Sequence, residues 1–379
     1  MKSFVRYYNL EYDIMEHPEN NSKYKGLIVN KGVTQPPTVS PYRAKHKKSK
    51  LLTSDEFVDG ILSGNRVVLS QAVTLIESSI SEHNNLAQEI IERCLPHSGN
   101  SIRVGITGVP GAGKSTSIDT FGMQLLEKGH KLAVLAIDPS SERSKGSILG
   151  DKTRMEKLSV ADNAFIRPSP SAGSLGGVAR KTRESIILCE AAGFDYIFVE
   201  TVGVGQSEIA VHSMVDFFLL IQLSGTGDEL QGIKRGIMEM ADGIVINKAD
   251  GDNIDKAKMA QRQLRNALHL YPIPDSGWAP EVLTYSGYYN LGIAEVWDMI
   301  DKYIAFVKNN GYFYHKRNEQ SKYLMLETIN EHLHNNFYND PVIAELLVML
   351  ESDLLNSKKS SYAAAKEALD AYSNLMNKG

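Results

Sequence analysis

The sequence predicts an α/β protein with a mostly parallel sheet flanked by helices, an N-terminal helical segment and a C-terminal helical arm. Between residues 101 and 311, short apolar runs typical of buried strands alternate with amphipathic helical patterns. Residues 51–100 and 312–379 carry helical patterns without strands. Residues 1–50 have no clear periodicity, so we expect a surface tail there.

Composition limits the function classes. The 379 residues suffice for one large α/β domain with additions, and the net charge of −4 gives no indication of a nucleic-acid partner. No apolar run approaches the roughly 18 residues of a membrane span, and the N-terminus lacks the apolar core of a signal peptide. Cys94 and Cys189 lie far apart in helical patterns, so we expect buried thiols. We therefore expect a cytoplasmic protein without nucleic-acid or membrane partners.

The N-terminal part is expected to be helical after the tail. A basic run at 45–50 is better explained by a solvated tail than by an anionic partner. Helical spacing then runs from 53 to 96, with pieces that start near Asp55 and continue at 68–78 and 87–95.

The central part contains the expected strands and helices of the sheet domain. Strands are predicted at 101–107, 131–137, 164–167, 196–199, 217–223, 243–246 and 282–285. Helices between them are predicted at 117–128, 178–192, 253–270 and 293–308. Sheets of this kind bind ligands at the carboxyl ends of their strands.

A phosphate-loop motif follows the first predicted strand. Two glycines with four residues between them, then Lys and Ser, occur in Gly108-Val109-Pro110-Gly111-Ala112-Gly113-Lys114-Ser115-Thr116. The glycines let backbone amides face an anion, and the N-terminus of the next helix adds partial positive charge. We expect Lys114 to reach the β- and γ-phosphates and Ser115 to bind Mg²⁺. The motif therefore predicts a P-loop NTPase fold.

A second motif identifies the base as guanine. Asn247-Lys248-Ala249-Asp250 follows the strand predicted at 243–246. Asp250 can accept hydrogen bonds from the adjacent N1–H and N2–H₂ groups of guanine, which adenine lacks. Asn247 can serve the N7/O6 edge, and the stem of Lys248 can lie over the ring. A second base contact is expected from the loop after the last strand, at Ser286, Gly287 and Tyr288. GTP and GDP are the expected ligands.

Acidic residues at strand ends are candidates for Mg²⁺ handling and hydrolysis. Glu200 ends one strand, where common GTPases have Asp, and Gly203 follows with an amide that can meet the γ-phosphate. Asp138 closes another strand and Asp151 follows it, although turn formation or helix capping also explains these two. We predict Ser115, Asp138, Asp151 and Glu200 as metal ligands, and Lys114, Asp138, Asp151, Glu200 and Gly203 as the catalytic set.

Two polar loops and the C-terminal helices complete the prediction. The Gly-rich loops 169–177 and 224–234 follow strands, and both nucleotide-responsive and ordinary solvated loops fit them. Helices predicted at 314–337, 341–355 and 362–376 cannot form much core alone. They are expected to pack on the parent domain or on a second subunit, and we favour an arm that forms a homodimer.

Together these segments resemble the MeaB/ArgK/MMAA family of P-loop GTPases, which are chaperones of adenosylcobalamin-dependent methylmalonyl-CoA mutase. The similarity runs from about residue 51 to the C-terminus. It is carried by 108–116, 138–141, 147–155, 167–170, 200–208, 227–234, 247–250, Glu319-Gln320 and Ala363-Ala364-Ala365.

The resemblance implies a slow GTPase that a partner stimulates and that gates cobalamin loading of the mutase. It implies switch regions at 138–155, 200–208 and 225–234, with Asp138, Asp151 and Glu200 matching family acids implicated in Mg²⁺ handling and hydrolysis. Two positions depart from the family: Lys145 stands where Gly is usual, and Gly287 where Ala is usual.

Other clients and other functions stay open at this point. A different cobalamin-dependent acyl-CoA mutase would suit the same motifs. A metallochaperone GTPase would usually carry Cys/His clusters, and a kinase would carry a kinase catalytic loop; the sequence contains neither. It also contains no Asp-x-His-x-x-Gly cobalamin motif, which fits a protein that helps load the cofactor without holding it.

Overall fold

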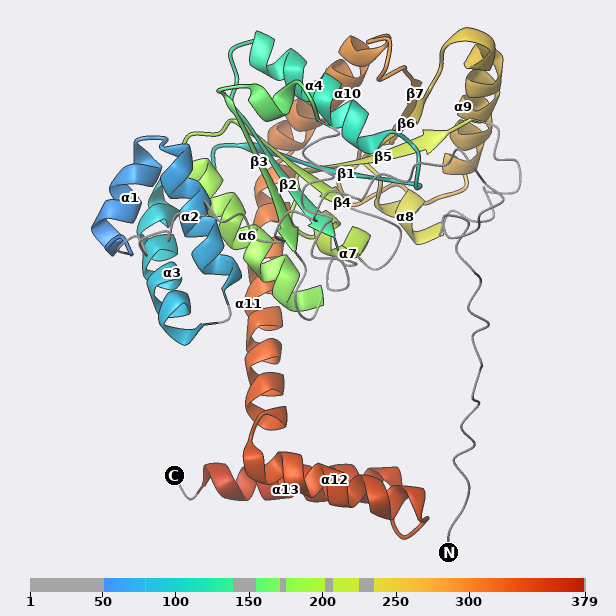
Figure 1. Cartoon of the computed structure of the whole chain (residues 1–379). Helices are drawn as coiled ribbons and strands as arrows, with labels where there is room; N and C mark the ends of the chain where they lie inside the picture. Colours follow the sequence, from blue (N-terminus) through green and yellow to red (C-terminus); the bar gives the residue numbers. More distant parts are fainter. Residues whose placement is uncertain are drawn as a thin grey trace, which may run out of the picture. The chain divides into compact units, whose positions relative to one another are not determined.

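The computed structural model describes residues 51–78, 80–138, 155–170, 175–201, 207–224 and 235–377. Within them the chain forms a seven-stranded sheet of order β3-β2-β4-β1-β5-β6-β7, and every strand pair is parallel. Figure 1 shows helices on both faces of this sheet. The predicted α/β class is confirmed. The tail predicted at 1–50 lies outside the described residues.

The strands follow the predicted order with small shifts at their ends. They are β1 (Ile102–Gly108), β2 (Leu132–Asp138), β3 (Ala164–Pro170), β4 (Tyr196–Thr201), β5 (Phe217–Leu223), β6 (Gly243–Asn247) and β7 (Glu281–Thr284).

The helices include two short ones that the sequence patterns did not predict, α7 and α8. The bounds are α1 (Ser54–Leu62), α2 (Arg66–Glu77), α3 (Ser81–Cys94), α4 (Lys114–Glu127), α6 (Leu175–Ala191), α7 (Ser207–His212), α8 (Arg235–Met240), α9 (Ile254–Leu268), α10 (Ile293–Asn309), α11 (Tyr312–Tyr338), α12 (Pro341–Leu355) and α13 (Ser361–Met376).

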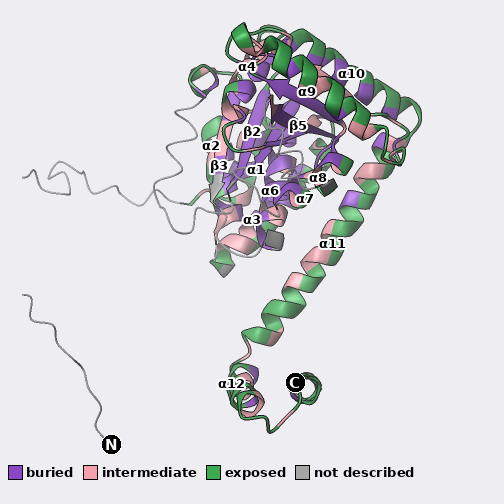
Figure 2. Cartoon of the chain, turned by 90° about the vertical axis from the view of Figure 1, so that its right-hand side faces the viewer, coloured by how far each residue is buried: buried purple, intermediate pink, exposed green. Residues whose placement is uncertain are grey.

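Side chains of the sheet alternate between two cores. In β2, Ala133 and Leu135 belong to the core beneath α1–α3, α6 and α7, whereas Leu132 and Val134 belong to the core beneath α4 and α10. Because both faces are covered, most strand positions are apolar, as in parallel sheets generally. Figure 2 shows these buried residues concentrated in the sheet. A third cluster packs α8 and α9 against β5, β6 and β7.

One strand continues past a proline that the sequence analysis took as its end. β3 was expected to stop before Pro168, but it runs to Pro170, and Pro168 pairs with Ala136 of β2. β3 is the edge strand of the sheet, so one side of it makes no ladder bonds and the missing N–H costs little there. The prediction of 169–177 as one loop was therefore wrong at both ends, because α6 begins at Leu175.

The C-terminal helices divide into an anchored and an extended part. Phe313 is buried in the core beneath α10, and α11 also packs against α6. Farther along α11 most residues are exposed (Figure 2). α12 and α13 pair around a small core of Leu350, Ala364 and Ala368.

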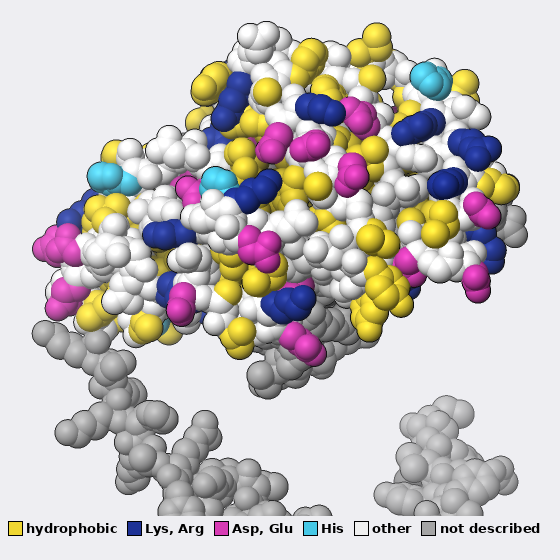
Figure 3. Space-filling view, turned by 90° about the horizontal axis from the view of Figure 1, so that it is seen from above, with side chains coloured by type: hydrophobic (Ala, Val, Ile, Leu, Met, Phe, Trp, Pro, Cys, Tyr) yellow, Lys and Arg dark blue, Asp and Glu magenta, His cyan; other side chains and the backbone are white. Residues whose placement is uncertain are grey.

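The surface carries charges of both signs. Figure 3 shows acidic and basic side chains interspersed over the face that it draws. Cys94 and Cys189 are both buried and unbridged, as predicted. In the part of the chain that is described, none of the helices has the length and apolar character needed to cross a bilayer.

Candidate nucleotide site

The phosphate-loop segment connects β1 to α4 at the point where the strand order reverses. β1 pairs with β4 on one side and with β5 on the other. The chain runs from β1 toward β2 and from β5 toward β6, so the crossovers that leave these two adjacent strands go in opposite directions. In parallel α/β sheets, ligands bind in the crevice beyond the carboxyl ends of strands at such a point. The fold therefore places residues 108–116 where a ligand site is expected.

The glycines of this loop are required by close contacts as well as by conformation. Gly108, Gly111 and Gly113 have φ values of 156°, 76° and 85°. A Cβ atom at Gly108 would lie 2.2 Å from the carbonyl oxygen of Ile221, and one at Gly113 would lie 2.6 Å from Nδ2 of Asn247. Side chains at these two positions would collide with β5 and with the base-reading motif.

Lys114 and Ser115 form the first turn of α4, whose N-cap is Gly113. The helix thus begins three residues before the predicted start, so its first free backbone amides belong to the motif itself. The Lys114 ammonium donates to the carbonyl oxygen of Gly108 at 2.9 Å. Ser115 Oγ donates to Oε1 of Glu200 at 3.4 Å. The structure therefore brings together the lysine, the hydroxyl and the carboxylate that the sequence analysis selected from two distant segments.

Glu200 occupies a buried position near the end of β4. Its side chain is only 3% exposed, and its neighbour Thr201 donates a hydrogen bond to Oγ1 of Thr107 at 2.9 Å. In the sheet register Glu200 lies beside Ile106 of β1 and Ala136 of β2. The carboxylate therefore stands among the three strand ends that surround the loop.

The base-reading motif is joined directly to the phosphate loop. Asn247 ends β6, and its Nδ2 donates to the carbonyl oxygen of Ala112 at 2.7 Å. Its Oδ1 accepts from the backbone amide of Gly287 at 3.0 Å. Ser286 donates from Oγ to Oδ2 of Asp250 at 2.6 Å. One asparagine thus holds together the three loops that the sequence analysis linked only by their motifs.

Lys248 lies within the Asn247–Asp250 motif in an unusual backbone conformation, and Tyr288 lies in the loop after β7, exposed at the surface. Lys248 has φ of 60°, a left-handed conformation that is uncommon for residues other than Gly, Asn and Asp. Such conformations recur at functional sites because the surrounding structure must hold them. Tyr288 is 81% exposed, so its ring lies at the surface of the loop rather than within the site.

Three residues that the sequence analysis did not select, Ser117, Thr120 and Tyr285, connect α4 to the end of β7 and the loop after it. Ser117 Oγ and Tyr285 OH lie 2.6 Å apart in a buried hydrogen bond, and the Tyr285 ring stacks on Phe121 of α4. Thr120 donates to the carbonyl oxygen of Gly287 at 2.8 Å. Burial raises the pKa of the Tyr285 phenol, which therefore stays protonated. No local motif marks these residues, because Ser117 and Tyr285 are 168 positions apart in the sequence.

Several predicted site residues lie outside the described residues. They are Asp151, Gly203, the side chain of Asp138, Lys145 and the segments 139–154, 202–206 and 225–234. The backbone of Asp138 ends β2, next to β4. Within the described ranges, no cluster of three or more His, Cys, Asp or Glu side chains is arranged to hold a metal ion.

Comparison with known proteins identifies the family. The family model described as methylmalonyl Co-A mutase-associated GTPase MeaB matches residues 69–341. The chain belongs to the MeaB family of GTPases. The match begins within α2 and runs through α3, the whole sheet and α11, and it includes every residue of the candidate site.

Relatives of this MeaB-family chain come from bacteria and animals. GTPase ArgK of Escherichia coli is 47% identical over 289 residues, which are 76% of this chain and 87% of that protein. The mitochondrial methylmalonic aciduria type A homolog of mouse is 45% identical over 328 residues, 84% of this chain and 79% of that protein. The solved structure of a LAO/AO transport system kinase has a TM-score of 0.69 and 35% identity, covering 86% of this chain and all of that one.

Proposed function

We propose that the loop after β1 binds GTP or GDP with Mg²⁺ and that the chain uses GTP hydrolysis to gate adenosylcobalamin loading of methylmalonyl-CoA mutase. The observation that supports the nucleotide part most strongly is the hydrogen bond from Asn247 to the carbonyl oxygen of Ala112. It joins a guanine-type loop to a phosphate-type loop, so base and phosphates can be bound at once.

The phosphate contacts are proposed for the loop amides and for Lys114. In the structure the Lys114 ammonium donates to the carbonyl oxygen of Gly108 in the same loop, at the N-terminus of α4. A phosphate is a stronger acceptor than a carbonyl oxygen. On nucleotide binding we expect the ammonium to exchange that carbonyl for the β- and γ-phosphate oxygens, while the loop amides surround the β-phosphate.

The metal contacts are proposed for Ser115 and Glu200, with Asp138 and Asp151 as further acids. A hydroxyl and a carboxylate oxygen 3.4 Å apart are the hard oxygen donors that Mg²⁺ accepts, so the described residues fit this ion. When bound, Mg²⁺ neutralises charge on the β- and γ-phosphates. Ser115 and Glu200 would orient it, and Gly203 would contact the γ-phosphate through its amide.

The base contacts are proposed for Asp250, Asn247, Lys248 and the loop after β7. One Asp250 carboxylate oxygen already accepts from Ser286, which fixes the carboxylate for two parallel hydrogen bonds to guanine. The amide of Gly287 is held by Asn247. Backbone groups of Ser286, Gly287 and Tyr288 would then approach the guanine oxygen.

The client is proposed from the family description and from relatives. The family is described as associated with methylmalonyl-CoA mutase, and a mouse relative carries the name of methylmalonic aciduria type A. We infer that the switch segments 138–155, 200–208 and 225–234 respond to the nucleotide and signal to the mutase. The alternative is the same role for another cobalamin-dependent acyl-CoA mutase, in the cytoplasm in either case.

A homodimer through the C-terminal arm belongs to the same proposal. Apolar side chains of α11–α13 are exposed where a monomer would be expected to carry polar ones. They are Met325, Leu326, Ile329, Leu333, Val348, Met349, Tyr362 and Leu369. A second copy of the arm would cover them.

Calorimetric titration with GTP, GDP and ATP in the presence of Mg²⁺ tests the nucleotide part. The chain is expected to bind GTP and GDP and to ignore ATP. Lys114→Ala should weaken GTP binding at least tenfold, because one charge-assisted hydrogen bond contributes about 1.5–3 kcal/mol. Lys128→Ala, at the exposed far end of α4, is the matched control and should bind normally. Near-normal affinity of Lys114→Ala would refute the phosphate-loop assignment.

A further inference from the structure

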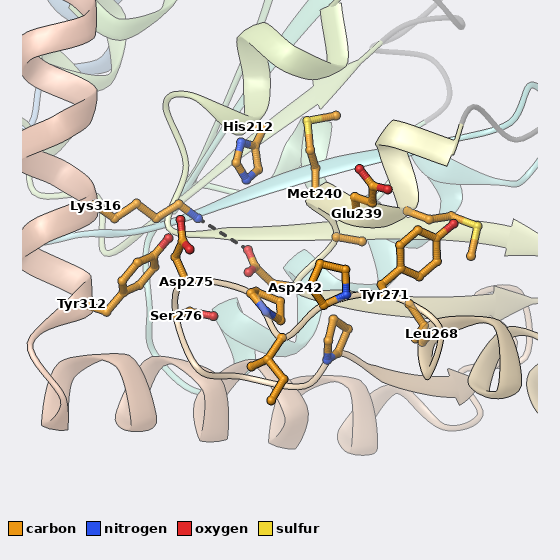
Figure 4. A pocket seen from close by; sticks show the side chains of 16 residues that line it. His212, Glu239, Met240, Asp242, Leu268, Tyr271, Asp275, Ser276, Tyr312 and Lys316 are labelled. Atoms are coloured by element: carbon orange, nitrogen blue, oxygen red, sulfur yellow. Dashed lines mark ion pairs between the residues drawn. The ribbon is translucent and has the colours of Figure 1, made fainter.

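A second cavity lies at the edge of the sheet opposite the nucleotide site. Its volume is about 320 Å³. Its walls come from the ends of α7 and α8, from the segment between α9 and β7, and from the first turns of α11 (Figure 4). Asp242 lines it just before β6, whereas Asn247 ends that strand in the nucleotide site. At 3.3 Å per residue the two residues are about 16 Å apart. The cavity is therefore not an extension of the nucleotide site.

The charged groups around the cavity are mostly acidic. Among the described lining residues, the carboxylates are Glu239, Asp242 and Asp275, and the only ammonium is that of Lys316. Lys316 is paired with Asp242 at 3.5 Å and also donates to the carbonyl oxygen of Asp216 at 2.9 Å. Asp242 accepts a further bond from the amide of Phe218. This ion pair is thus satisfied internally, and the described wall carries three carboxylates against one ammonium.

The remaining titratable groups add no positive charge at neutral pH. Burial, assisted by the nearby Lys316 ammonium, lowers the pKa of His212 to about 4, so its ring is neutral. Burial and the carboxylates of Asp242 and Asp275 raise the pKa of Tyr312, so its phenol keeps its proton. Figure 4 shows Asp275 beside Tyr312 and the end of Lys316. A negative potential therefore coincides with an aromatic face.

The rest of the wall is apolar and partly aromatic. In Figure 4, Tyr271, which follows α9, and Met240, which ends α8, lie on one side of the cavity. Tyr312 lies on the other side. Pro272, Pro274 and Pro280 stiffen the segment between α9 and β7. Rings and a thioether suit the apolar body of a ligand, and tyrosine faces attract cations within about 6 Å.

We propose that this cavity binds a small organic cation, namely a primary amine or guanidine attached to an apolar or aromatic body. Asp275 would pair with the cationic group, and Tyr271, Tyr312 and Met240 would contact the body. The volume lies at the lower end of the range of roughly 300–1,000 Å³ for small-molecule sites, so the ligand has about the size of an amino acid.

The position of the cavity also suggests an effect on the nucleotide site, a part that rests on the proposed function. His212 ends α7, and Met240 ends α8. These helices begin directly after 202–206 and 225–234, two segments within the proposed switches. A ligand held between the far ends of both helices is expected to change the affinity for GDP, and by linkage GDP changes the affinity for the cation by the same factor.

Three probes of similar size test the charge preference. Phenethylammonium, phenethyl alcohol and 3-phenylpropionate share an aromatic body and carry a positive, zero or negative charge. Titration of the full chain by calorimetry and by amide chemical shifts should show one saturable site for the cation, with shifts at the residues lining the cavity. The alcohol should bind several-fold more weakly, and the carboxylate should not bind. Equal binding of all three, or binding of none up to millimolar concentration, would overturn the proposal.

Variants assign the site and separate it from the proposed function. Asp275→Asn keeps the shape and removes the charge, so cation affinity should fall about fivefold. Asp298→Asn, on exposed α10 surface, makes the same charge change away from the cavity and should leave affinity intact. Equal effects of the two variants would refute the site. GDP affinity is measured on the same samples. Normal GDP binding without cation binding would overturn the cavity proposal alone. Cation binding that leaves GDP affinity unchanged would overturn only the coupling between the two sites.

Discussion

The side chain of Asn247 connects what would otherwise be separate parts of the site. Its amide nitrogen donates to the phosphate loop and its amide oxygen accepts from the loop after β7. Buried at 4% exposure, it sits where a Cβ at Gly113 would collide with it. Gly113 therefore leaves room for the Asn247 side chain in addition to giving the loop its left-handed conformation.

Replacement of Asp250 by Asn should change the base preference of the site. Asn presents one acceptor and one donor, so it loses one of two hydrogen bonds to guanine and opposes an N–H with an NH₂ group. We expect GTP affinity to fall by at least tenfold, as for about 1.5–3 kcal/mol from a hydrogen bond to a charged group. Xanthosine triphosphate should gain affinity, because its base has a carbonyl group where guanine has the N2 amino group. Competition titrations measure both effects.

Asp252→Asn provides the control, because Asp252 is exposed in the short turn after the motif. Unchanged preference for GTP over xanthosine triphosphate in Asp250→Asn would show that this carboxylate does not read the base.

At the residue scale, the sequence allowed predictions where a local motif carries the chemistry. The phosphate loop and the Asn247–Asp250 motif could be placed because their spacing is local and they follow strands. The hydrogen bond of Ser117 with Tyr285 could not be predicted. It joins residues 168 positions apart, and neither belongs to a spacing pattern.

Helix α11 is fixed to the sheet by buried polar contacts rather than by apolar packing alone. Arg317 donates from Nε and Nη2 to the two carboxylate oxygens of Asp216, at 2.8 and 2.7 Å, and also reaches the carbonyl oxygen of Ser101. One turn on, Gln320 donates to the carbonyl oxygen of Val215 at 2.8 Å. The segment 213–216 directly follows α7, so α11 is anchored to the chain just beyond a proposed switch.

Arg317→Ala should destabilise the protein by about 3 kcal/mol, because it leaves the buried carboxylate of Asp216 without its cation. Adding Asp216→Asn in the same chain should recover part of this loss. Chemical denaturation measures the free energy of unfolding in each case. Lys322→Ala, an exposed position on the same helix, is the control and should have no measurable effect. A loss no larger than that of the control would show that the ion pair does not anchor α11.

At the level of elements, sequence patterns located strands and helices better than their ends. β2 and β5 were recognisable because they are buried on both faces and almost entirely apolar. The end of β3 was missed because a proline ends a strand only where the strand needs ladder hydrogen bonds on both sides. β3 is an edge strand, and its edge position depends on the strand order, which the local sequence does not contain. The start of α3 was missed because its first turns are polar.

The whole molecule combines a sheet domain with an arm whose first part belongs to that domain. The boundary predicted at 312 coincides with the start of α11, yet Phe313, Arg317 and Gln320 pack on the sheet domain. The arm proper therefore begins farther along α11. Sequence periodicity marked the helix but could not show which of its turns are anchored.

Two truncations distinguish these parts. Removal of 339–379 takes away α12 and α13 and should leave a folded chain that binds GDP and sediments as a monomer. Removal of 312–379 also takes away the anchor of α11 and should lower the melting temperature by several degrees, as expected for a loss of a few kcal/mol. Sedimentation and thermal unfolding measure these outcomes. A dimer that persists without 339–379 would place the interface elsewhere.

The measurement that tests the central claim most directly is steady-state GTP hydrolysis by the full chain, alone and with purified methylmalonyl-CoA mutase, with ATP as control. The account predicts a slow rate with GTP, a severalfold increase when the mutase is added, and no hydrolysis of ATP under either condition. A GTP rate that does not respond to the mutase would contradict the proposed client, and equal hydrolysis of ATP would contradict the guanine site.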